Sequence, residues 1–208
     1  MKTAPALVKI AALLGLSIAS ATAVSLSADS LRPDADGYIR DWVMLAPIVV
    51  REGETCAEAL LRDSVPKESA LKPKAGDKVT LGGKELSWRN VTASTNFFDF
   101  NETLKSINDH VAGYIVTYVE CDADIPEVVM AVASNDQGRI YFNGVDIYAY
   151  TEARPLMLDA DKGKVTLKKG TNVIVFKITN EQNSWQGAMR FLDKSGKPLK
   201  NLRIKLQP

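Results

Sequence analysis

The sequence contains very little histidine and cysteine. Its 208 residues include one histidine, His110, and two cysteines, Cys56 and Cys121. A zinc site of mixed His and Cys ligands and a His-based catalytic dyad therefore lack the parts that they need. A Gly-x-Ser-x-Gly elbow and a phosphate-cradling glycine loop are also missing. These absences exclude the common hydrolase and nucleotide-binding motifs.

Paired carboxylates could in principle run glycoside hydrolysis. The available pairs are Asp99 with Glu102 and Asp122 with Asp124. Both pairs lie in polar connecting segments, where acidic side chains are simply solvated. We therefore expect a protein that is not an enzyme.

The chain has no excess of charge of either sign, with 26 Lys and Arg against 25 Asp and Glu. Removing residues 1–23 takes away two lysines and leaves 24 basic against 25 acidic residues. A near-neutral balance gives no indication of binding to nucleic acid or to an anionic membrane surface.

The first 23 residues have the pattern of a secretory signal peptide. Lys2 and Lys9 precede an apolar stretch at 10–18, and small residues at 19–23 offer cleavage after Ala21 or Ala23. The stretch is too short for a stable membrane span. We expect a secreted or periplasmic protein, with one domain at 24–208 and no membrane span in the mature chain.

The two cysteines leave two alternatives open. Export would place Cys56 and Cys121 in an oxidising compartment, where a disulfide could close a long loop and add about 2–4 kcal/mol. One pair without framework spacing fits two buried, unpaired thiols equally well.

Short strands at regular intervals predict an all-β protein. One strand spans 38–45, ends at Ala46-Pro47 and forms the entry edge of the fold. A hairpin over 78–91 turns at Gly82-Gly83. Eight further strands are expected at 112–121, 128–133, 139–142, 145–150, 164–167, 172–179, 185–192 and 202–206. A single short helix, preceded by the capping residue Thr55, is expected at 55–62. This pattern indicates an antiparallel β-sandwich or jelly roll.

Two of these segments show their environment through alternation. In residues 172–179 one face of the expected strand is fully apolar. The other face, which carries Val173, Val175 and Lys177, is partly apolar. A strand that is apolar on both faces is expected in the middle of a sheet. In residues 187–192, Met189 and Phe191 share one face while Arg190 points to a wet side.

Several motifs follow one another in an order that resembles a known family. They are Gly76-Asp77-Lys78-Val79, Trp88, residues 112–119, residues 134–144, residues 165–172, Trp185, Arg190-Phe191 and residues 193–199. With them the chain resembles the galactose-binding-like jelly-roll modules of secreted bacterial proteins. These modules are similar to the sugar-binding domain of family 2 glycosidases and, more loosely, to PA14 domains. Residues 41–47 look like the opening strand, although Ala46 and Ile48 depart from the usual Gly-Pro-Phe.

The resemblance implies a non-catalytic module that binds carbohydrate. PA14-like lectins hold calcium with two adjacent aspartates, at the turn where this chain has Asn135-Asp136. Asp136 is thus a candidate structural calcium ligand, the only cofactor considered. The alternative is that Asp136 and Gly138 simply make the turn.

Aromatic residues near polar loops are the candidate ligand-binding residues. Trp185 with Asn183, Gln186 and Arg190 could stack on a sugar ring and bond its hydroxyl groups. Tyr148 and Tyr150, expected to share a face with Asp146, form a further candidate surface. Core packing is the alternative for Trp185, and we favour it for Trp88. The phenylalanines of residues 97–100 are interpreted as a buried plug.

The sequence therefore predicts a non-catalytic β-sandwich that binds carbohydrate through loops at one end. The alternative is an assembly module that binds another extracytoplasmic protein through a sheet face or an edge strand. Exposed aromatics grouped with amides would favour sugar, whereas a dry apolar patch would favour a protein partner.

Overall fold

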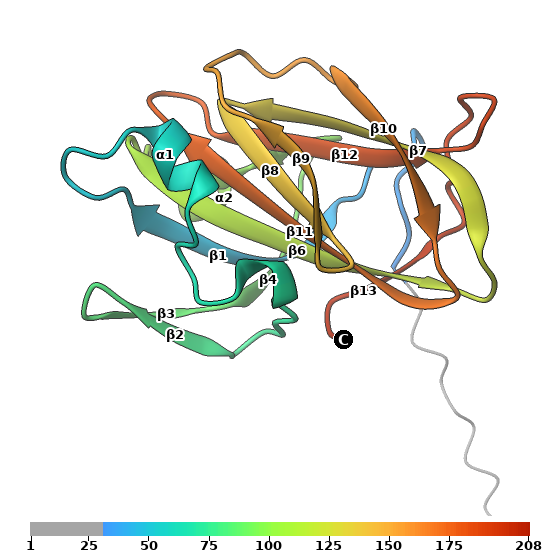
Figure 1. Cartoon of the computed structure of the whole chain (residues 1–208), viewed down its shortest axis with the longest axis horizontal. Helices are drawn as coiled ribbons and strands as arrows, with labels where there is room; N and C mark the ends of the chain where they lie inside the picture. The colour runs from blue at the N-terminus through green and yellow to red at the C-terminus, as the bar shows by residue number, and fades with distance from the viewer. Residues whose placement is uncertain (1–30) are drawn as a thin grey trace, which may run out of the picture.

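The computed structural model describes residues 31–208, and the expected signal peptide lies outside the described residues. Two antiparallel sheets stack face to face (Figure 1). Sheet A runs β4-β1-β6-β11-β8-β9, with β13 also paired to β6. Its strands are β1 (Asp41–Val49), β4 (Arg89–Thr92), β6 (Val111–Cys121), β8 (Gln137–Phe142), β9 (Val145–Tyr150), β11 (Gly170–Asn180) and β13 (Arg203–Lys205). Sheet B runs β10-β7-β12-β5, with strands β10 (Asp161–Leu167), β7 (Ile125–Asn135), β12 (Gln186–Leu192) and β5 (Phe98–Asp99). The predicted all-β antiparallel sandwich is confirmed.

The eight strands expected after residue 110 are all present as β6 to β13. The strand predicted to be central, β11, lies between β6 and β8. Strand β12 also follows its pattern, because Met189 and Phe191 are buried while Arg190 is half-buried. Period-two alternation thus located the strands correctly, since it records which face each side chain takes.

The prediction for the first strand was wrong in two ways. Strand β1 continues past Pro47 to Val49, and it lies between β4 and β6 rather than at an edge. Its pairing with β6 shifts register between Leu45 and Ile48. Proline cannot donate to a regular ladder, so the irregular stretch is where it can be accommodated inside a paired strand.

The expected hairpin at 78–91 is split at Trp88. Strands β2 (Lys78–Leu81) and β3 (Lys84–Ser87) pair with each other, whereas the residues after Trp88 form β4 and pair with β1. Through Trp88 the β2–β3 hairpin continues directly into β4, which belongs to sheet A. Figure 1 shows β2 and β3 on the side of sheet A away from sheet B.

Helices are few and short. Helix α1 (Cys56–Leu61) has the expected Thr55 cap, completed by Glu58 as a capping box. A second helix, α2 (Phe100–Leu104), was not expected and is capped by Asp99, and η1 (Glu68–Ala70) is a single 3₁₀ turn. Within residues 31–208, no helix has the length and apolar character that crossing a bilayer requires.

The core between the two sheets is rich in large side chains, and Trp185 belongs to it. Its fully buried aromatic members are Trp42, Phe98, Phe100, Phe176, Trp185 and Phe191. The expected phenylalanine plug is therefore confirmed for Phe98 and Phe100, while Phe97 is half-buried.

A second core lies on the opposite face of sheet A. The segment from α1 to β3 covers this face, burying Trp88, Tyr114, Tyr118 and Tyr141 beneath it. We call residues 55–88 the cover. Because of the cover, both faces of sheet A are shielded from solvent at its centre. The interpretation of Trp88 as a core residue, favoured in the sequence analysis, is confirmed.

Candidate functional site

The structure places Trp185 in the core, with no exposed surface. Its ring stacks on Phe100 with centroids 4.1 Å apart, and its indole N–H donates to the carbonyl of Ile178 at 3.2 Å. An indole that is buried, stacked on Phe100 and hydrogen-bonded to Ile178 cannot present a face to a sugar. The polar loop before Trp185 suggested exposure, but Trp185 itself turns inward beside Phe100 and Gly113.

Asn183 stays at the surface, apart from the buried indole. Its backbone is left-handed, with φ of 67°. Its N–H donates to Asp109 at 2.9 Å, and its carbonyl accepts from Asn101 at 2.6 Å. These bonds tie the loop to α2 and to the segment after it. Asn183 therefore serves here as a loop anchor rather than as part of a platform.

Arg190 is engaged on the outer face of sheet B. Its guanidinium forms an ion pair with Asp159, with Nε 2.9 Å from Oδ1, and donates to the carbonyl of Asp36 at 2.8 Å. It also lies 4.6 Å from the ring centroid of Tyr38. Burial raises the pKa of Tyr38 to about 12, with the Asp159 carboxylate acting in the same direction. The group ties the first described residues to sheet B.

The Arg190–Asp159 ion pair predicts an acid-sensitive contribution to stability. Burial by itself would raise the pKa of Asp159, but the hydrogen bond and charge of Arg190 lower it more. A carboxylate with a lowered folded pKa stabilises the fold above its unfolded pKa and loses that effect as the pH falls through the folded value. We expect Asp159→Asn to cost about 1–3 kcal/mol at pH 7.

Urea unfolding from pH 7 down to pH 2 measures this effect. The difference between Asp159→Asn and wild type should narrow steadily below about pH 4. Asp122→Asn, in the exposed pair with Arg203, is the matched control and should show a much smaller change of the same sign, because solvent screens that pair. A difference between Asp159→Asn and wild type that is independent of pH would contradict the assignment.

Tyr148 and Tyr150 lie near the exposed edge of sheet A, but neither is free. The hydroxyl of Tyr148 donates to Asp161 at 2.8 Å and accepts from Arg154 at 2.8 Å. The guanidinium of Arg154 covers the ring of Tyr150 at 3.6 Å and also pairs with Asp161. Burial is the largest cause that raises the pKa of Tyr148. Arg154 therefore occupies the position in which a ligand would stack.

The expected face shared by these tyrosines and Asp146 is broken by a bulge. Tyr148 lies opposite Ile140, whereas Asp146 lies opposite Tyr141, so Ile147 is the extra residue. Opposed residues share a face, and the bulge turns Asp146 to the face of Tyr141. There it accepts from Arg139 at 2.7 Å. Simple alternation could not predict this change of face.

Asp136 is buried at the end of β7, where its carboxylate accepts from the N–H of Glu181 at 2.9 Å. Burial is the largest cause that raises its pKa, while the hydrogen bond from the N–H of Glu181 opposes that change and the Glu181 carboxylate adds to it. No group of three or more His, Cys, Asp or Glu side chains in residues 31–208 could hold a metal ion. These contacts are those of a turn-stabilising residue, and the calcium role of Asp136 stays a prediction.

The structure brings His110 to Cys56, which the sequence reasoning missed. Nδ1 of His110 lies 3.6 Å from the sulfur, and the thiol donates to the carbonyl of Asn180 at 3.4 Å. A cysteine beside a histidine is the arrangement found in nucleophilic Cys–His dyads. However, burial raises the pKa of Cys56 to about 11, and Glu181 and Asp136 act in the same direction. The buried neutral thiol is a poor nucleophile at pH 7.

The two cysteines are free. Cys56 lies beside His110, just before β6 begins, and Cys121 is the last residue of β6. The eleven residues of β6 place the two cysteines at opposite ends of this strand, roughly 30 Å apart. A disulfide requires Cα atoms within about 7 Å, so the thiol alternative is the one that the structure supports.

Under the cover lies a buried ion pair between Lys177 and Glu68, both without exposed surface. Nζ lies 2.8 Å from Oε1 of Glu68 and 2.6 Å from the carbonyl of Arg62. The Glu68 carboxylate also accepts from the N–H of Ser64 and the hydroxyls of Tyr114 and Tyr141. Burial lowers the pKa of Lys177, and Glu68 opposes that change. Both charged groups have hydrogen-bond partners from the cover and from sheet A, so the pair links the cover to sheet A.

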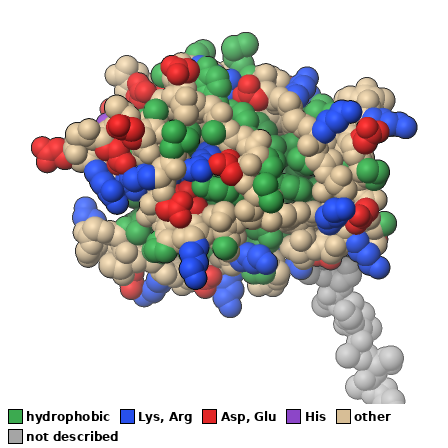
Figure 2. Space-filling view, viewed as in Figure 1, with side chains coloured by type: hydrophobic (Ala, Val, Ile, Leu, Met, Phe, Trp, Pro, Cys, Tyr) green, Lys and Arg blue, Asp and Glu red, His purple; other side chains and the backbone are tan. Residues whose placement is uncertain are grey.

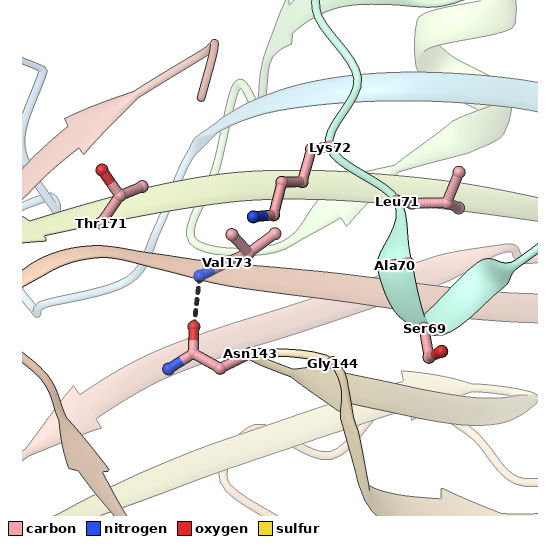
Figure 3. A pocket seen from close by; sticks show the side chains of 8 residues that line it. All are labelled: Ser69, Ala70, Leu71, Lys72, Asn143, Gly144, Thr171 and Val173. Carbon is pink, nitrogen blue, oxygen red and sulfur yellow. Dashed lines mark hydrogen bonds between the residues drawn. The ribbon is translucent and has the colours of Figure 1, made fainter.

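A pocket of about 640 Å³ opens at the side of the cover (Figure 3). Its lining comes from the segment around η1, from the Asn143-Gly144 turn and from the start of β11. Lys72 extends toward Val173, whose N–H donates to Asn143 at 2.8 Å (Figure 3). Lys72 is the only charged residue of this lining, so the pocket fits a small polar ligand better than an apolar one.

The other candidate surface is apolar and lies between the edge strands β9 and β10. Figure 2 shows hydrophobic side chains gathered on this side. A groove of about 100 Å³ here has Met130, Val132, Ile147 and Val165 in its lining. Val145 and Ile147 of β9 are 61% and 37% exposed. Met157 and Leu158, in the loop that joins the two strands, are exposed as well. We call this surface the open side.

No protein-family model matches the chain, and the curated proteins include no match to it. The resemblance to galactose-binding-like modules therefore stays a prediction.

Proposed function

We propose that this is an exported, non-catalytic binding module that recognises another extracytoplasmic protein through the open side. One observation carries the proposal. Large aliphatic side chains are exposed along the edge strand β9, whereas every Phe, Trp and Tyr ring among residues 31–208 is buried or half-buried. Apolar surface next to free backbone groups suits a protein partner, and sugar stacking needs a free ring.

Carbohydrate binding is the second proposal, and the pocket beside Lys72 supports it. An ammonium group in an otherwise neutral lining could bind a sugar that carries a carboxylate. The two proposals use surfaces from different parts of the fold, so variants separate them. Lys72→Ala alters the pocket, and Ile147→Asp alters the open side.

Photocrosslinking in the exporting cell tests the leading proposal. With p-benzoylphenylalanine in place of Ile147, we expect a discrete crosslinked protein, identified by mass spectrometry. The same amino acid in place of Ile107, which is 77% exposed in a distant loop, is the matched control and should give none.

A glycan array on the purified protein tests the carbohydrate proposal. Retention that is lost in Lys72→Ala and kept in Ile147→Asp, together with no discrete crosslink at position 147, would overturn the protein-partner proposal in favour of sugar.

A further inference from the structure

A pocket of about 580 Å³ lies between the end of β1 and the β2–β3 hairpin. Strand β1 contributes Pro47, Ile48 and Val49 to its lining, and the hairpin contributes Leu81 and Leu86. Figure 1 shows the turn of this hairpin on the same side of the molecule as the end of β1. A concave site of this volume is in the range that holds one small molecule. We call it the hairpin pocket.

The strand residues that line the hairpin pocket are mostly aliphatic. Ile48 belongs to the second core and is 7% exposed, and Leu81 and Leu86 are half-buried against the same core. Val49 is 69% exposed. An aliphatic chain laid on these side chains would leave water, and each methylene group buried in this way increases an affinity about fourfold. The lining therefore favours a ligand with an aliphatic chain.

The charged residues of the lining are all basic. They are Arg51, Arg62 and Lys84, and no Asp or Glu of residues 31–208 lines the pocket. Arg62 is already engaged, because its guanidinium pairs with Glu54 and also donates to the hydroxyl of Ser64 at 3.0 Å. Arg62 therefore belongs to the scaffold of the pocket.

Arg51 and Lys84 are the cations that remain for a ligand. Both are exposed, and neither forms an ion pair within the part of the chain that the structure describes. Glu85, which follows Lys84, pairs with Lys78 at 2.8 Å instead. A carboxylate could accept charge-assisted hydrogen bonds from a guanidinium and an ammonium group together. The lining thus combines an aliphatic surface with a site for one anionic group.

The scarcity of neutral polar groups argues against a peptide in this pocket. Ser64 has the only uncharged polar side chain among the described residues of the lining, and its hydroxyl already accepts from Arg62. A peptide would bury amide groups without partners, and that burial is unfavourable. An unbranched hydrocarbon chain has no such groups.

We propose that the hairpin pocket binds the anion of a single-chain fatty acid. The aliphatic chain packs against Ile48, Leu81 and Leu86, and the carboxylate lies between Arg51 and Lys84. This site is distinct from the open side, so the inference goes beyond the proposed function and either can fail without the other.

Isothermal titration calorimetry of the purified protein with octanoate and decanoate tests the inference. We expect decanoate to bind about fifteenfold more tightly than octanoate, because it buries two more methylene groups. Decyltrimethylammonium has a chain of the same length and the opposite charge, and we expect it to bind at least about tenfold more weakly than decanoate. Absence of binding by either fatty acid, or equal affinity for decanoate and decyltrimethylammonium, would overturn the inference.

Variants of the lining locate the site. Val49→Asp places a carboxylate in the lining at an exposed position, and it should weaken decanoate binding by about tenfold or more. The double variant Arg51→Gln with Lys84→Gln removes both free cations and keeps the aliphatic surface, so it should weaken decanoate binding by about tenfold and leave decyltrimethylammonium binding no weaker. Circular dichroism confirms that each variant is folded.

Two matched variants outside the hairpin pocket are the controls. Ile107→Asp changes an aliphatic residue that is 77% exposed, and Lys72→Gln changes an exposed lysine in the lining of a different pocket. Both should bind decanoate as the wild type does. Decanoate binding that is unchanged by Val49→Asp, or that is lost instead in Ile147→Asp on the open side, would show that the fatty acid does not occupy the hairpin pocket.

Discussion

Glu68→Gln is expected to lower the free energy of unfolding by about 3–5 kcal/mol, because it leaves the ammonium group of Lys177 buried without a counter-charge. Both side chains lack exposed surface, so no water replaces the lost carboxylate charge. The glutamine amide keeps the shape, but its NH2 group replaces one carboxylate oxygen and so faces a hydroxyl that already donates, that of Tyr114 on one side or that of Tyr141 on the other.

The double variant Glu68→Gln with Lys177→Met distinguishes charge pairing from general damage to the core. Its cost should be smaller than the sum of the single costs by about 1 kcal/mol or more, since removing both charges leaves neither uncompensated. Glu85→Gln in the exposed pair with Lys78 is the control, with an expected change within about 0.5 kcal/mol. Urea unfolding measures the wild type, the two single variants, the double variant and the control. Equal effects of Glu68→Gln and Glu85→Gln would show that the buried pair does not link the cover to sheet A.

Trp185→Ala is expected to destabilise the fold by about 3–5 kcal/mol, through the cavity that it leaves in the core between the sheets. The indole is fully buried, stacks on Phe100, and satisfies the carbonyl of Ile178. Its ring also lies so close to Gly113 that a Cβ there would meet the ring at 2.7 Å. The ring therefore fills space that no neighbouring side chain could occupy without moving.

Trp185→Phe isolates the contribution of the ring from that of its N–H. It should cost about 1–3 kcal/mol, because a smaller ring remains while the carbonyl of Ile178 loses its donor. Thermal unfolding and urea midpoints measure both variants. A Trp185→Ala protein that unfolds at the wild-type midpoint would return this residue to the list of ligand-binding candidates.

Several side chains that were candidates for a functional site could not be placed from local sequence. Trp185 follows five polar residues, and nothing in that segment distinguishes a ring at the surface from one that turns toward Phe100, which lies 85 residues earlier. Cys56 and His110 are 54 residues apart and meet only because α1 folds over the end of sheet A. Contacts of this kind depend on packing between distant segments.

Lys177 is different, because the sequence contained a signal for it. Its strand has apolar residues on both faces, which indicates a strand covered on both sides. A lysine in such a strand must be buried and must therefore be paired. The partner, Glu68, carries no comparable signal, since it lies in a polar, proline-rich segment that resembles a surface loop.

The amino-acid sequence by itself determined the strands after residue 110 and the antiparallel class, because alternation and turn residues act over a few neighbouring positions. Only the tertiary structure decided which faces are dry. The cover buries the outer face of sheet A, a one-residue bulge turns Asp146 away from Tyr148, and sheet order leaves one edge of β9 and one edge of β10 free. Each of these depends on which distant segment packs against which face, and the free energy of burial is shared among residues that no short window contains.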